Sequence, residues 1–333
     1  MKGQQGGVGW GSAVVQAMRD MSATVREFTL VPDGGAIDWQ PGSHLRMRLS
    51  TDQLAGSHAE PQVRSYSLVG EPDGCYRIAV KRLDDGRGGS TAMWRLAVGD
   101  RLDIGEPQND FALDLNAPAY LLIAGGIGIT PLLRMARQLA DRSASVRMLY
   151  AARSEAELVY GDMLQDWLGE RLCAAPGAAA RTLAFDAEIA RLPERAQVYA
   201  CGPVSLMDAL RSAWEASGRP PADLRFETFG SSGTMPAEAF RVRIPRHALD
   251  ITVPVGSSLL EALEQAGVQT LSDCRRGECG LCAMDVLAVD GAIDHRDVFL
   301  SAHEKSANTR ICACVSRVVG SVTLDTAYRA ESA

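Results

Sequence analysis

The sequence lacks a hydrophobic run long enough to cross a membrane, and it lacks an excess of positive charge. Its most apolar stretch, residues 119–133, contains three glycines and is shorter than the about 20 residues that a membrane-spanning helix needs. The first residues, MKGQQGGVGWGSAVVQ, contain no apolar core of a signal peptide. A formal net charge of -7 provides no long-range attraction for nucleic acid. We therefore predict a cytoplasmic protein with no membrane or nucleic-acid partner.

Cysteine is also sparse, because eight cysteines in 333 residues are too few to indicate a disulfide framework. Five of the eight nevertheless lie within the last sixty residues. Residues 273–282 read D-C-R-R-G-E-C-G-L-C, which places Cys274, Cys279 and Cys282 in a C-x4-C-x2-C pattern. This spacing is typical of plant-type [2Fe-2S] ferredoxins, in which four thiolates hold two irons.

The cysteine pattern is less typical of zinc. Zinc sites usually combine a C-x2-C pair with a second such pair or with two histidines tens of residues away, whereas this pair has only an extra cysteine before it. We therefore predict an iron–sulfur cluster on these three cysteines, with Cys312 or Cys314 as the fourth ligand. The plant-type gap of 29 residues after Cys282 ends at Cys312.

Residues 1–113 read as short strands separated by the turn signals P-D-G-G, Q-P-G and P-D-G. Strands with such turns between them predict an antiparallel barrel rather than alternating helix and strand. A polar, glycine-containing stretch, residues 51–62, predicts a long loop. The predicted strands are residues 12–18, 24–31, 44–49, 63–69, 76–80 and 101–104.

Two patterns in this barrel could hold an anionic, planar cofactor. In R-S-Y-S, Arg64 and Tyr66 provide a cationic fork and an aromatic face that can flank one flavin ring. In G-R-G-G-S-T, residues 86–91, consecutive glycine amides and the Ser90 hydroxyl precede a short apolar segment. Such groups at a helix start form a phosphate cradle. Taken alone, either pattern is also common in an ordinary strand or an exposed turn.

From Pro118 the sequence alternates between strand and helix. Residues 119–124 are a buried parallel strand by pattern, and they run into G-G-I-G-I-T-P, with Pro131 at the start of an apolar helix. A strand, a glycine turn and a helix N-terminus in succession form a dinucleotide pyrophosphate site. The turn is not the G-x-G-x-x-G of ordinary Rossmann dehydrogenases. Further strands are predicted at residues 146–151, 182–185 and 197–200, with residues 173–180 as a connector.

The last of these strands runs into Cys201, Gly202 and Pro203, at the carboxyl end of the sheet where ligands bind. By itself, Cys201 is equally a small buried thiol. Residues 230–238 read as a linker. The residues after the linker predict a small β-grasp ferredoxin domain. Its expected elements are a hairpin, a helix that begins at a capping box at residues 258–261 and ends at Gly267, and strands at 284–289 and 318–324.

Together these motifs resemble the phthalate dioxygenase reductase family, which includes vanillate O-demethylase reductases. The matching motifs span nearly the whole chain, in the characteristic order of flavin barrel, nicotinamide domain and C-terminal ferredoxin. In this chain the expected domains are the flavin barrel at residues 1–113, the nicotinamide domain at residues 114–229 and the ferredoxin domain at residues 239–333. The motifs are P-G-S-H, R-S-Y-S-L, G-R-G-G-S, P-x-N-x-F, G-G-I-G-I-T-P, C-G-P, E-T-F, the cysteine loop, D-H-R-D and C-V-S-R.

The resemblance implies FMN and NADH as cofactors beside the [2Fe-2S] cluster. It places Phe229, from E-T-F, against the flavin ring, with Thr130 and Cys201 beside the nicotinamide. It favours Cys314 in C-V-S-R as the fourth ligand, with a two-residue insertion in a hairpin at residues 287–293. The expected FMN contacts are Arg64, Tyr66, Ser67, Gly88, Gly89 and Ser90, and the expected coenzyme contacts are Gly125, Gly126, Gly128, Gly202 and Pro203.

The domain order suits the chemistry, because NADH donates two electrons as a hydride whereas a [2Fe-2S] cluster accepts one, and a flavin can mediate between them. We therefore expect a monomeric reductase that passes electrons to a separate Rieske non-heme iron oxygenase of the aromatic ring dioxygenase or O-demethylase type. The alternatives are a stand-alone flavin reductase and a donor to a cytochrome P450. Arg275 and Arg276, inside the cysteine loop, further predict an acceptor whose docking face is acidic.

Overall fold

The computed structural model describes residues 9–50, 62–84, 88–229, 233, 235–236 and 238–325. The predicted loop at residues 51–62 lies outside these ranges except for Gln62. The described chain forms two compact units. The first contains the residues up to Asp84, Gly88–Gly202 and Leu210–Phe226, and the second contains Pro203–Ala209 and the residues from Glu227 onward. No helix among the described residues is long and apolar enough to span a membrane.

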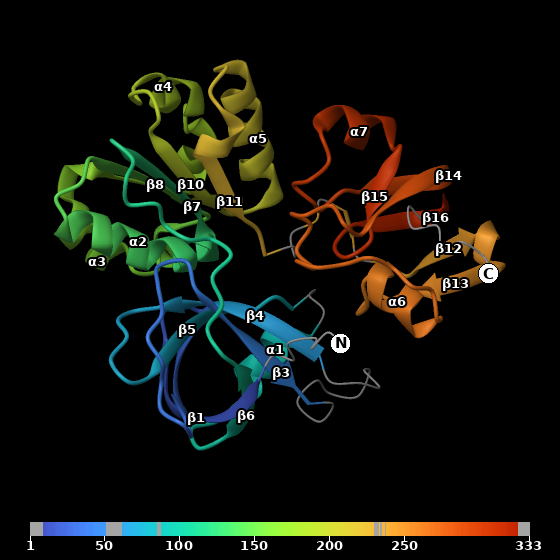
Figure 1. The fold of residues 1–333 in the computed structure, drawn as a ribbon, viewed down its shortest axis with the longest axis horizontal. Helices are drawn as coiled ribbons and strands as arrows, with labels where there is room; N and C mark the ends of the chain where they lie inside the picture. The colour runs from blue at the N-terminus through green and yellow to red at the C-terminus, as the bar shows by residue number, and fades with distance from the viewer. Residues whose placement is uncertain are drawn as a thin grey trace, which may run out of the picture. The chain divides into compact units, whose positions relative to one another are not determined.

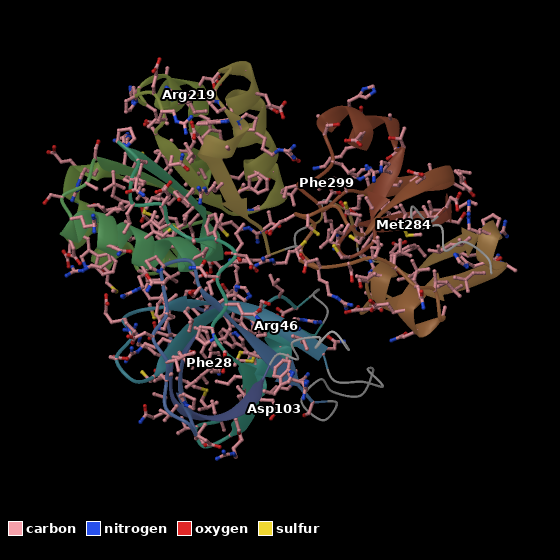
Figure 2. The ribbon with its side chains drawn as sticks, viewed as in Figure 1. Phe28, Arg46, Asp103, Arg219, Met284 and Phe299 are labelled. Atoms are coloured by element: carbon pink, nitrogen blue, oxygen red, sulfur yellow. The ribbon has the colours of Figure 1, made fainter. Side chains whose placement is uncertain are left out.

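The first unit begins with a closed antiparallel barrel whose strand order is β1-β2-β5-β4-β3-β6. Along its strands alternate side chains point inward, and Phe28 lies among the buried side chains (Figure 2). All six predicted barrel strands are confirmed. Their bounds are β1 Trp10–Asp20, β2 Val25–Pro32, β3 His44–Leu49, β4 Gln62–Val69, β5 Tyr76–Lys81 and β6 Arg101–Gly105; the short helix α1, Gly89–Arg95, lies between β5 and β6.

A five-stranded sheet with the order β11-β10-β7-β8-β9 follows in the chain, with helices between its strands (Figure 1). The pairs β10–β7, β7–β8 and β8–β9 are parallel, as predicted. The strands are β7 Tyr120–Gly125, β8 Val146–Ala152, β9 Leu172–Pro176, β10 Gln197–Cys201 and β11 Leu224–Glu227, and the helices are α2 Ile129–Asp141, α3 Gly161–Leu168, α4 Phe185–Ala190 and α5 Val204–Ala216.

One strand of this sheet was wrongly placed by the sequence pattern. The predicted strand at residues 182–185 is absent, because Phe185 begins α4. The edge strand is instead β9, in the alanine-rich segment predicted to be a connector. Alanine has little intrinsic preference for strands. Here the backbone groups of Leu172–Pro176 gain hydrogen bonds by pairing with β8, and this tertiary pairing overrides the composition.

The second unit contains a mixed five-stranded sheet with the order β13-β12-β16-β14-β15. Ser258 caps α6, and its hydroxyl accepts from the Glu261 N–H while the Glu261 carboxylate accepts from the Ser258 N–H, so the predicted capping box is confirmed. The elements are β12 Phe240–Ile244, β13 Leu249–Val253, α6 Leu259–Gln265, β14 Ala283–Asp294, α7 Ala302–Ala307, β15 Arg310–Cys312 and β16 Arg317–Asp325.

The expected hairpin at residues 287–293 is wrong. These residues belong to one continuous strand, β14, whose register against β16 shifts between Val286 and Ala288. The extra residue of this irregularity is Leu287, whose side chain is exposed. A β-bulge accommodates one inserted residue without breaking the strand, so a change in chain length here does not need a new turn.

Within the first unit, a charged cluster joins the barrel to the parallel sheet. Glu157 follows β8 and accepts a hydrogen bond from Thr24 Oγ1 at 2.6 Å, and it also forms an ion pair with Lys81 of β5. Nearby, the Tyr160 hydroxyl donates to Glu27 Oε2 at 2.7 Å. Burial by itself raises the pKa of Glu157, but the hydrogen bonds from Lys81 and Thr24 outweigh it and hold that pKa below its ordinary value.

We expect Glu157→Gln to lower the free energy of unfolding at pH 7 by about 2 kcal/mol, because it leaves the half-buried Lys81 ammonium without its charged partner. A carboxylate with a lowered folded pKa stabilises the protein above its unfolded pKa, and that stability is lost as pH falls through the folded value. The variant should therefore lose this part of the acid dependence. Urea unfolding at several pH values measures both effects.

The control is Glu155→Gln, because Glu155 is exposed on the same turn. Equal unfolding free energies for Glu157→Gln and wild type at pH 7 would contradict the structural role of this cluster.

Candidate functional site

The segment containing the first three cysteines, residues 274–282, has no regular secondary structure and is called the cluster loop below. Arg275 and Gly277 adopt positive φ angles of 51° and 80°, which turn the backbone N–H groups inward. The N–H groups of Arg276, Glu278 and Cys279 each lie 3.4 Å from the Cys274 sulfur. Peptide donors aimed at a sulfur are the environment that an anionic iron–sulfur cluster needs, so the loop fits the predicted group.

The remaining cysteines lie at the same place in the sheet. Cys282 precedes β14, Cys312 ends β15, and both are buried with Cys314. The Cys312 and Cys314 side chains lie near the Cys282 sulfur and lower the pKa of Cys282. The predicted metal ligands thus lie near one another, with Cys312, although no group of three or more His, Cys, Asp or Glu side chains among the described residues is arranged as a metal site in this structure.

The surroundings of the two candidates for fourth ligand differ. The pKa of Cys314 is raised by its hydrogen bond to Cys282, by burial, and by the charges of Cys282 and Cys274. The pKa of Cys312 is raised by its bond to Cys282, by burial, and by the Asp297 carboxylate. The charges that raise the pKa of Cys314 thus come from both ends of the cluster loop, whereas the pKa of Cys312 is raised by the charge of Asp297.

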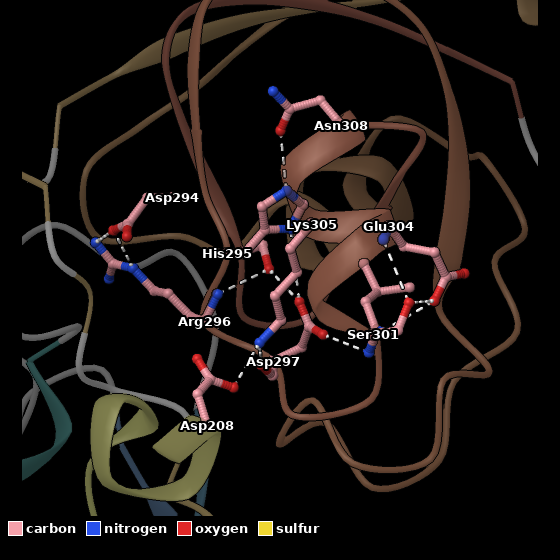
Figure 3. Close-up of polar contacts among 11 residues, drawn as sticks. Asp208, Asp294, His295, Arg296, Asp297, Ser301, Glu304, Lys305 and Asn308 are labelled. Atoms are coloured by element: carbon pink, nitrogen blue, oxygen red, sulfur yellow. Dashed lines mark hydrogen bonds and ion pairs between the residues drawn. The ribbon is translucent and has the colours of Figure 1, made fainter. Parts of the chain in front are cut away.

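Sequence reasoning found the D-H-R-D motif but gave its residues no role. Asp297 is fully buried and accepts hydrogen bonds from the Leu300 N–H at 2.8 Å and from the Ser316 hydroxyl at 3.2 Å. Lys305 donates to its carbonyl at 2.7 Å (Figure 3). The next residue, Val298, donates its N–H to the Gly277 carbonyl at 3.0 Å. Asp297 thus anchors a segment that supports the cluster loop.

Burial would raise the pKa of Asp297, but the nearby His295 ring, the hydrogen bond from the Leu300 N–H and the charge of Lys305 lower it. The sequence signal for this anchor was an acidic residue at the end of the polar run D-H-R-D, residues 294–297. Ser316 and Arg317 of C-V-S-R are anchors of the same kind, because Arg317 is buried and donates to the Ser257 carbonyl at 2.7 Å.

In the first unit, the two predicted coenzyme turns meet. A side chain on Gly128 would lie 2.2 Å from the Cys201 carbonyl oxygen and 2.9 Å from the Gly202 nitrogen, so only glycine permits this backbone approach. Gly126 has a φ of 54° and lies in the turn that ends the buried strand β7. The buried Thr130 at the start of α2 donates its hydroxyl to the Ile127 carbonyl at 3.0 Å.

The two predicted flavin patterns also meet. A Cβ on Gly89 would lie 2.6 Å from Arg64 Nε. The Arg64 side chain, on β4, therefore packs directly on Gly89, the first residue of α1. Gly88 precedes that helix with a φ of 77°. Ser90 is a departure, because its hydroxyl accepts a hydrogen bond from the Leu83 N–H at 3.0 Å and is therefore already engaged.

Two further residues of β4 suit a ring system. Burial raises the pKa of Tyr66 to about 12, so its hydroxyl remains protonated and can donate a hydrogen bond at neutral pH. The Ser67 hydroxyl is buried and has no hydrogen-bond partner among the described residues. A buried polar atom without a partner is costly, so a ligand atom at Ser67 would remove this cost, and the residues fit a flavin. Phe229 is half-buried, two residues after β11.

The two arginines of the cluster loop differ in exposure. The Arg276 side chain is only 14% exposed and forms an ion pair with Glu227. The neighbouring Arg275 is 52% exposed. Adjacent residues in an irregular loop point in different directions, and sequence alone does not say which one turns inward.

We expect Gly128→Ala to raise KM for NADH by about tenfold or more. The new Cβ would push the coenzyme turn away from the Cys201 carbonyl, and overpacking of this kind costs about 1 to 3 kcal/mol. Steady-state reduction of ferricyanide measures this. The control is Gly161→Ala, where the new Cβ would be 3.7 Å from the Leu158 side chain, an ordinary contact. An unchanged KM in Gly128→Ala would show that the turn tolerates a side chain.

Comparison with known families identifies two parts of this chain. Residues 122–173 match the model of the oxidoreductase NAD-binding domain. Residues 244–319 match the model of the 2Fe-2S iron-sulfur cluster binding domain, which favours the cluster over a zinc site. The strand, turn and helix around Gly128 lie in the first match, and all the predicted metal ligands lie in the second.

Relatives match nearly the whole length. The chain is 35% identical over 314 residues, 93% of its length and 96% of the relative, to the heme-dependent oxidative N-demethylase beta subunit of Ectopseudomonas mendocina (strain ymp). It is 36% identical over 264 residues, 76% of its length and 80% of the relative, to the phthalate dioxygenase reductase of Burkholderia cepacia.

Among solved structures, the chain is similar to a phthalate dioxygenase reductase whose modular structure serves electron transfer from pyridine nucleotides to [2Fe-2S]. The match covers 95% of this chain and 98% of the reductase chain. The TM-score is 0.71 and the sequence identity is 31%. The predicted fold class is thereby confirmed, and the two family matches support the predicted nicotinamide coenzyme and [2Fe-2S] cluster. On these similarities, which cover the barrel, the parallel sheet and the ferredoxin unit alike, the chain belongs to the phthalate dioxygenase reductase family as an NADH-dependent iron–sulfur flavoprotein that transfers electrons to an oxygenase.

Proposed function

We propose that this protein is the reductase component of a two-component Rieske non-heme iron oxygenase, with electrons passing from NADH to FMN, to the [2Fe-2S] cluster and then to the oxygenase. The observation that carries the proposal is the convergence of the cysteine sulfurs with three peptide donors on Cys274, in a chain that also holds the close backbone turn at Gly128. The turn at Gly128 suits the binding of a hydride donor, and the cysteine loop suits a one-electron carrier.

The residue roles are part of the proposal. Cys274, Cys279, Cys282 and Cys314 hold the cluster, and Cys314 is favoured over Cys312 because it begins the C-V-S-R motif shared with the family. The cluster, when bound, supplies one-electron transfer. Around it, the backbone amides of the cluster loop compensate the negative charge of the sulfurs. The proposed domains are residues 1–113 for FMN, 114–229 for NAD, 230–238 as linker and 239–333 for the cluster.

On the flavin side, we assign Arg64, Tyr66 and Ser67 to the ring system, since these side chains combine a cation, a protonated hydroxyl and a buried hydroxyl that lacks a partner. FMN, when bound, accepts the hydride as an electron pair and releases single electrons. The α1 start provides backbone N–H groups for its phosphate. The proposed phosphate contacts are Gly88, Gly89 and Ser90.

On the coenzyme side, the turn after β7 and the turn after β10 provide backbone N–H groups for the pyrophosphate. Thr130, Cys201 and Phe229 are proposed to line the place where the nicotinamide meets the flavin ring, with Thr130 held by its bond to Ile127. The proposed coenzyme contacts are Gly125, Gly126, Gly128, Gly202 and Pro203.

The acceptor is the finer part of the proposal. Relatives named as dioxygenase reductases favour an aromatic ring dioxygenase or O-demethylase partner. A second candidate is a heme-containing oxygenase, as in a cytochrome P450 system, because one relative that matches over 93% of this chain is the beta subunit of a heme-dependent N-demethylase. We further propose a cytoplasmic monomer that docks with a separate oxygenase.

The relay is tested on the whole protein under anaerobic conditions. Addition of NADH should bleach the flavin and cluster absorption bands and produce the electron paramagnetic resonance signal of a reduced [2Fe-2S] cluster. In Cys274→Ser the flavin should still be reduced, while reduction of the oxygenase partner is lost. If Cys274→Ser reduced the partner at the wild-type rate, the relay would be wrong and a stand-alone flavin reductase would remain.

The FMN assignment is tested by Ser67→Ala. Loss of the hydroxyl should raise the dissociation constant for FMN by about fivefold to tenfold, since a hydrogen bond contributes about 1 kcal/mol. Fluorescence titration of the flavin-free protein measures it. The matched control is Ser65→Ala, because Ser65 is exposed on the same strand, and equal constants for both variants would remove Ser67 from the site.

A further inference from the structure

The end of β11 and the cluster loop lie against each other in the second unit, although about fifty residues separate them. The Thr228 N–H donates to Glu278 Oε1 at 2.5 Å, and the Thr228 hydroxyl donates to the Arg276 carbonyl at 2.9 Å. The Arg276 guanidinium forms an ion pair with Glu227 and lies 3.6 Å from Glu278 Oε2. These four residues, Glu227, Thr228, Arg276 and Glu278, are called the loop clamp.

The loop clamp is buried. Its charged side chains are only 4% exposed for Glu227, 14% for Arg276 and 17% for Glu278, and Thr228 is almost completely enclosed. A buried ion pair gives up most of its hydration energy, so it adds less stability than its charges suggest. What such a set does provide is one fixed geometry, because Thr228, Arg276 and Glu278 each contact two or more of the other members.

The two loop residues that the clamp holds also contact the cluster site. The Arg276 side chain and carbonyl contact Glu227 and Thr228, and the Glu278 side chain contacts Thr228. The N–H groups of Arg276 and Glu278 each lie 3.4 Å from the Cys274 sulfur. Hydrogen bonds to the sulfurs and nearby charge set the reduction potential of an iron–sulfur cluster. A shift of the β11 end therefore changes these N–H···S contacts.

On its other side the clamp leads into the residue proposed to lie at the flavin, because Thr228 is followed directly by Phe229. The residue proposed to contact the flavin is therefore the direct chain neighbour of a clamp residue. The cysteine motif supplies Arg276 and Glu278 to this connection, whereas Glu227 and Thr228 lie before the linker and outside that motif.

We propose that the loop clamp sets both the reduction potential of the [2Fe-2S] cluster and the rate at which it receives an electron, by holding the cluster loop on the segment that ends in Phe229. The inference rests on the proposed relay. In that step one electron passes from the reduced flavin to the cluster, one Fe(III) becomes Fe(II), and no bond forms or breaks. The clamp residues act through the loop, so they are positioning residues.

The chain contains a matched control. Arg275 is next to Arg276 and has the same charge, but its side chain is 52% exposed and pairs with Glu264 of α6 at 2.6 Å. Neutralising either arginine changes the net charge equally. Only the change at Arg276 breaks the clamp, so a difference between the two variants reports geometry rather than total charge.

The experiment uses the whole protein with FMN and cluster bound, in the variants Thr228→Val, Thr228→Ser, Arg276→Gln and Arg275→Gln. Iron and sulfide content first establishes that each variant carries its cluster. A redox titration followed by electron paramagnetic resonance then gives the cluster potential. Rapid mixing with NADH separates flavin reduction from the later bleaching of the cluster.

We expect Thr228→Val and Arg276→Gln to lower the cluster potential, because N–H donors and positive charge stabilise the more negative reduced state. Cluster bleaching should slow by about tenfold, equivalent to about 1.4 kcal/mol in the barrier, while flavin reduction keeps its wild-type rate. Thr228→Ser, which retains the hydroxyl, should restore both values. Arg275→Gln should match wild type in both.

The proposal is overturned if Thr228→Val and Arg276→Gln keep the wild-type potential and bleaching rate, or if Arg275→Gln changes them as much. Should Thr228→Val fail to assemble its cluster, Arg276→Lys, which retains the charge but not the planar fork, carries the same test. Failure of the relay is a different result, since wild-type protein itself would then show no NADH-dependent bleaching, while the potentials would still decide on the clamp.

Discussion

The need to compensate buried thiolate charge with peptide N–H groups determines the form of the cysteine-rich unit. Three donors from residues 276–279 can point at one sulfur only if the backbone leaves helical and extended conformations, as Arg275 and Gly277 do with positive φ angles. A loop shaped in this way makes few hydrogen bonds of its own. It must therefore be held by other segments, and the unit is built to do this.

A second constraint of the same kind operates in the first unit. Phosphate binding by backbone N–H groups requires that strand ends and helix starts approach closely, because the groups themselves are short. Gly128 allows this by leaving room for the Cys201 carbonyl. The charged cluster around Glu157 then links the parallel sheet to the barrel, and the coenzyme turn and the β4 residues belong to the same compact unit.

The sequence predicts features that depend on neighbours in the chain, and it fails where distant segments decide. The capping box at Ser258 and the glycine turn after β7 are local, and both were found. The edge strand β9 forms because β8 is beside it, and the bulge at Leu287 because β16 continues past it. The inward turn of Arg276 depends on Glu227, about fifty residues earlier. No local pattern encodes these pairings.

The cluster loop is held from two directions by segments of different origin. Val298, after the buried Asp297, binds the Gly277 carbonyl, and a side chain on Gly277 would lie 2.9 Å from the Asp297 backbone. From the other direction Thr228 binds the residues on both sides of Gly277. A loop fixed at one residue from both sides cannot shift without breaking one of these contacts. Its position, and with it the environment of the Cys274 sulfur, is therefore set by the D-H-R-D and E-T-F segments rather than by the cysteine motif itself.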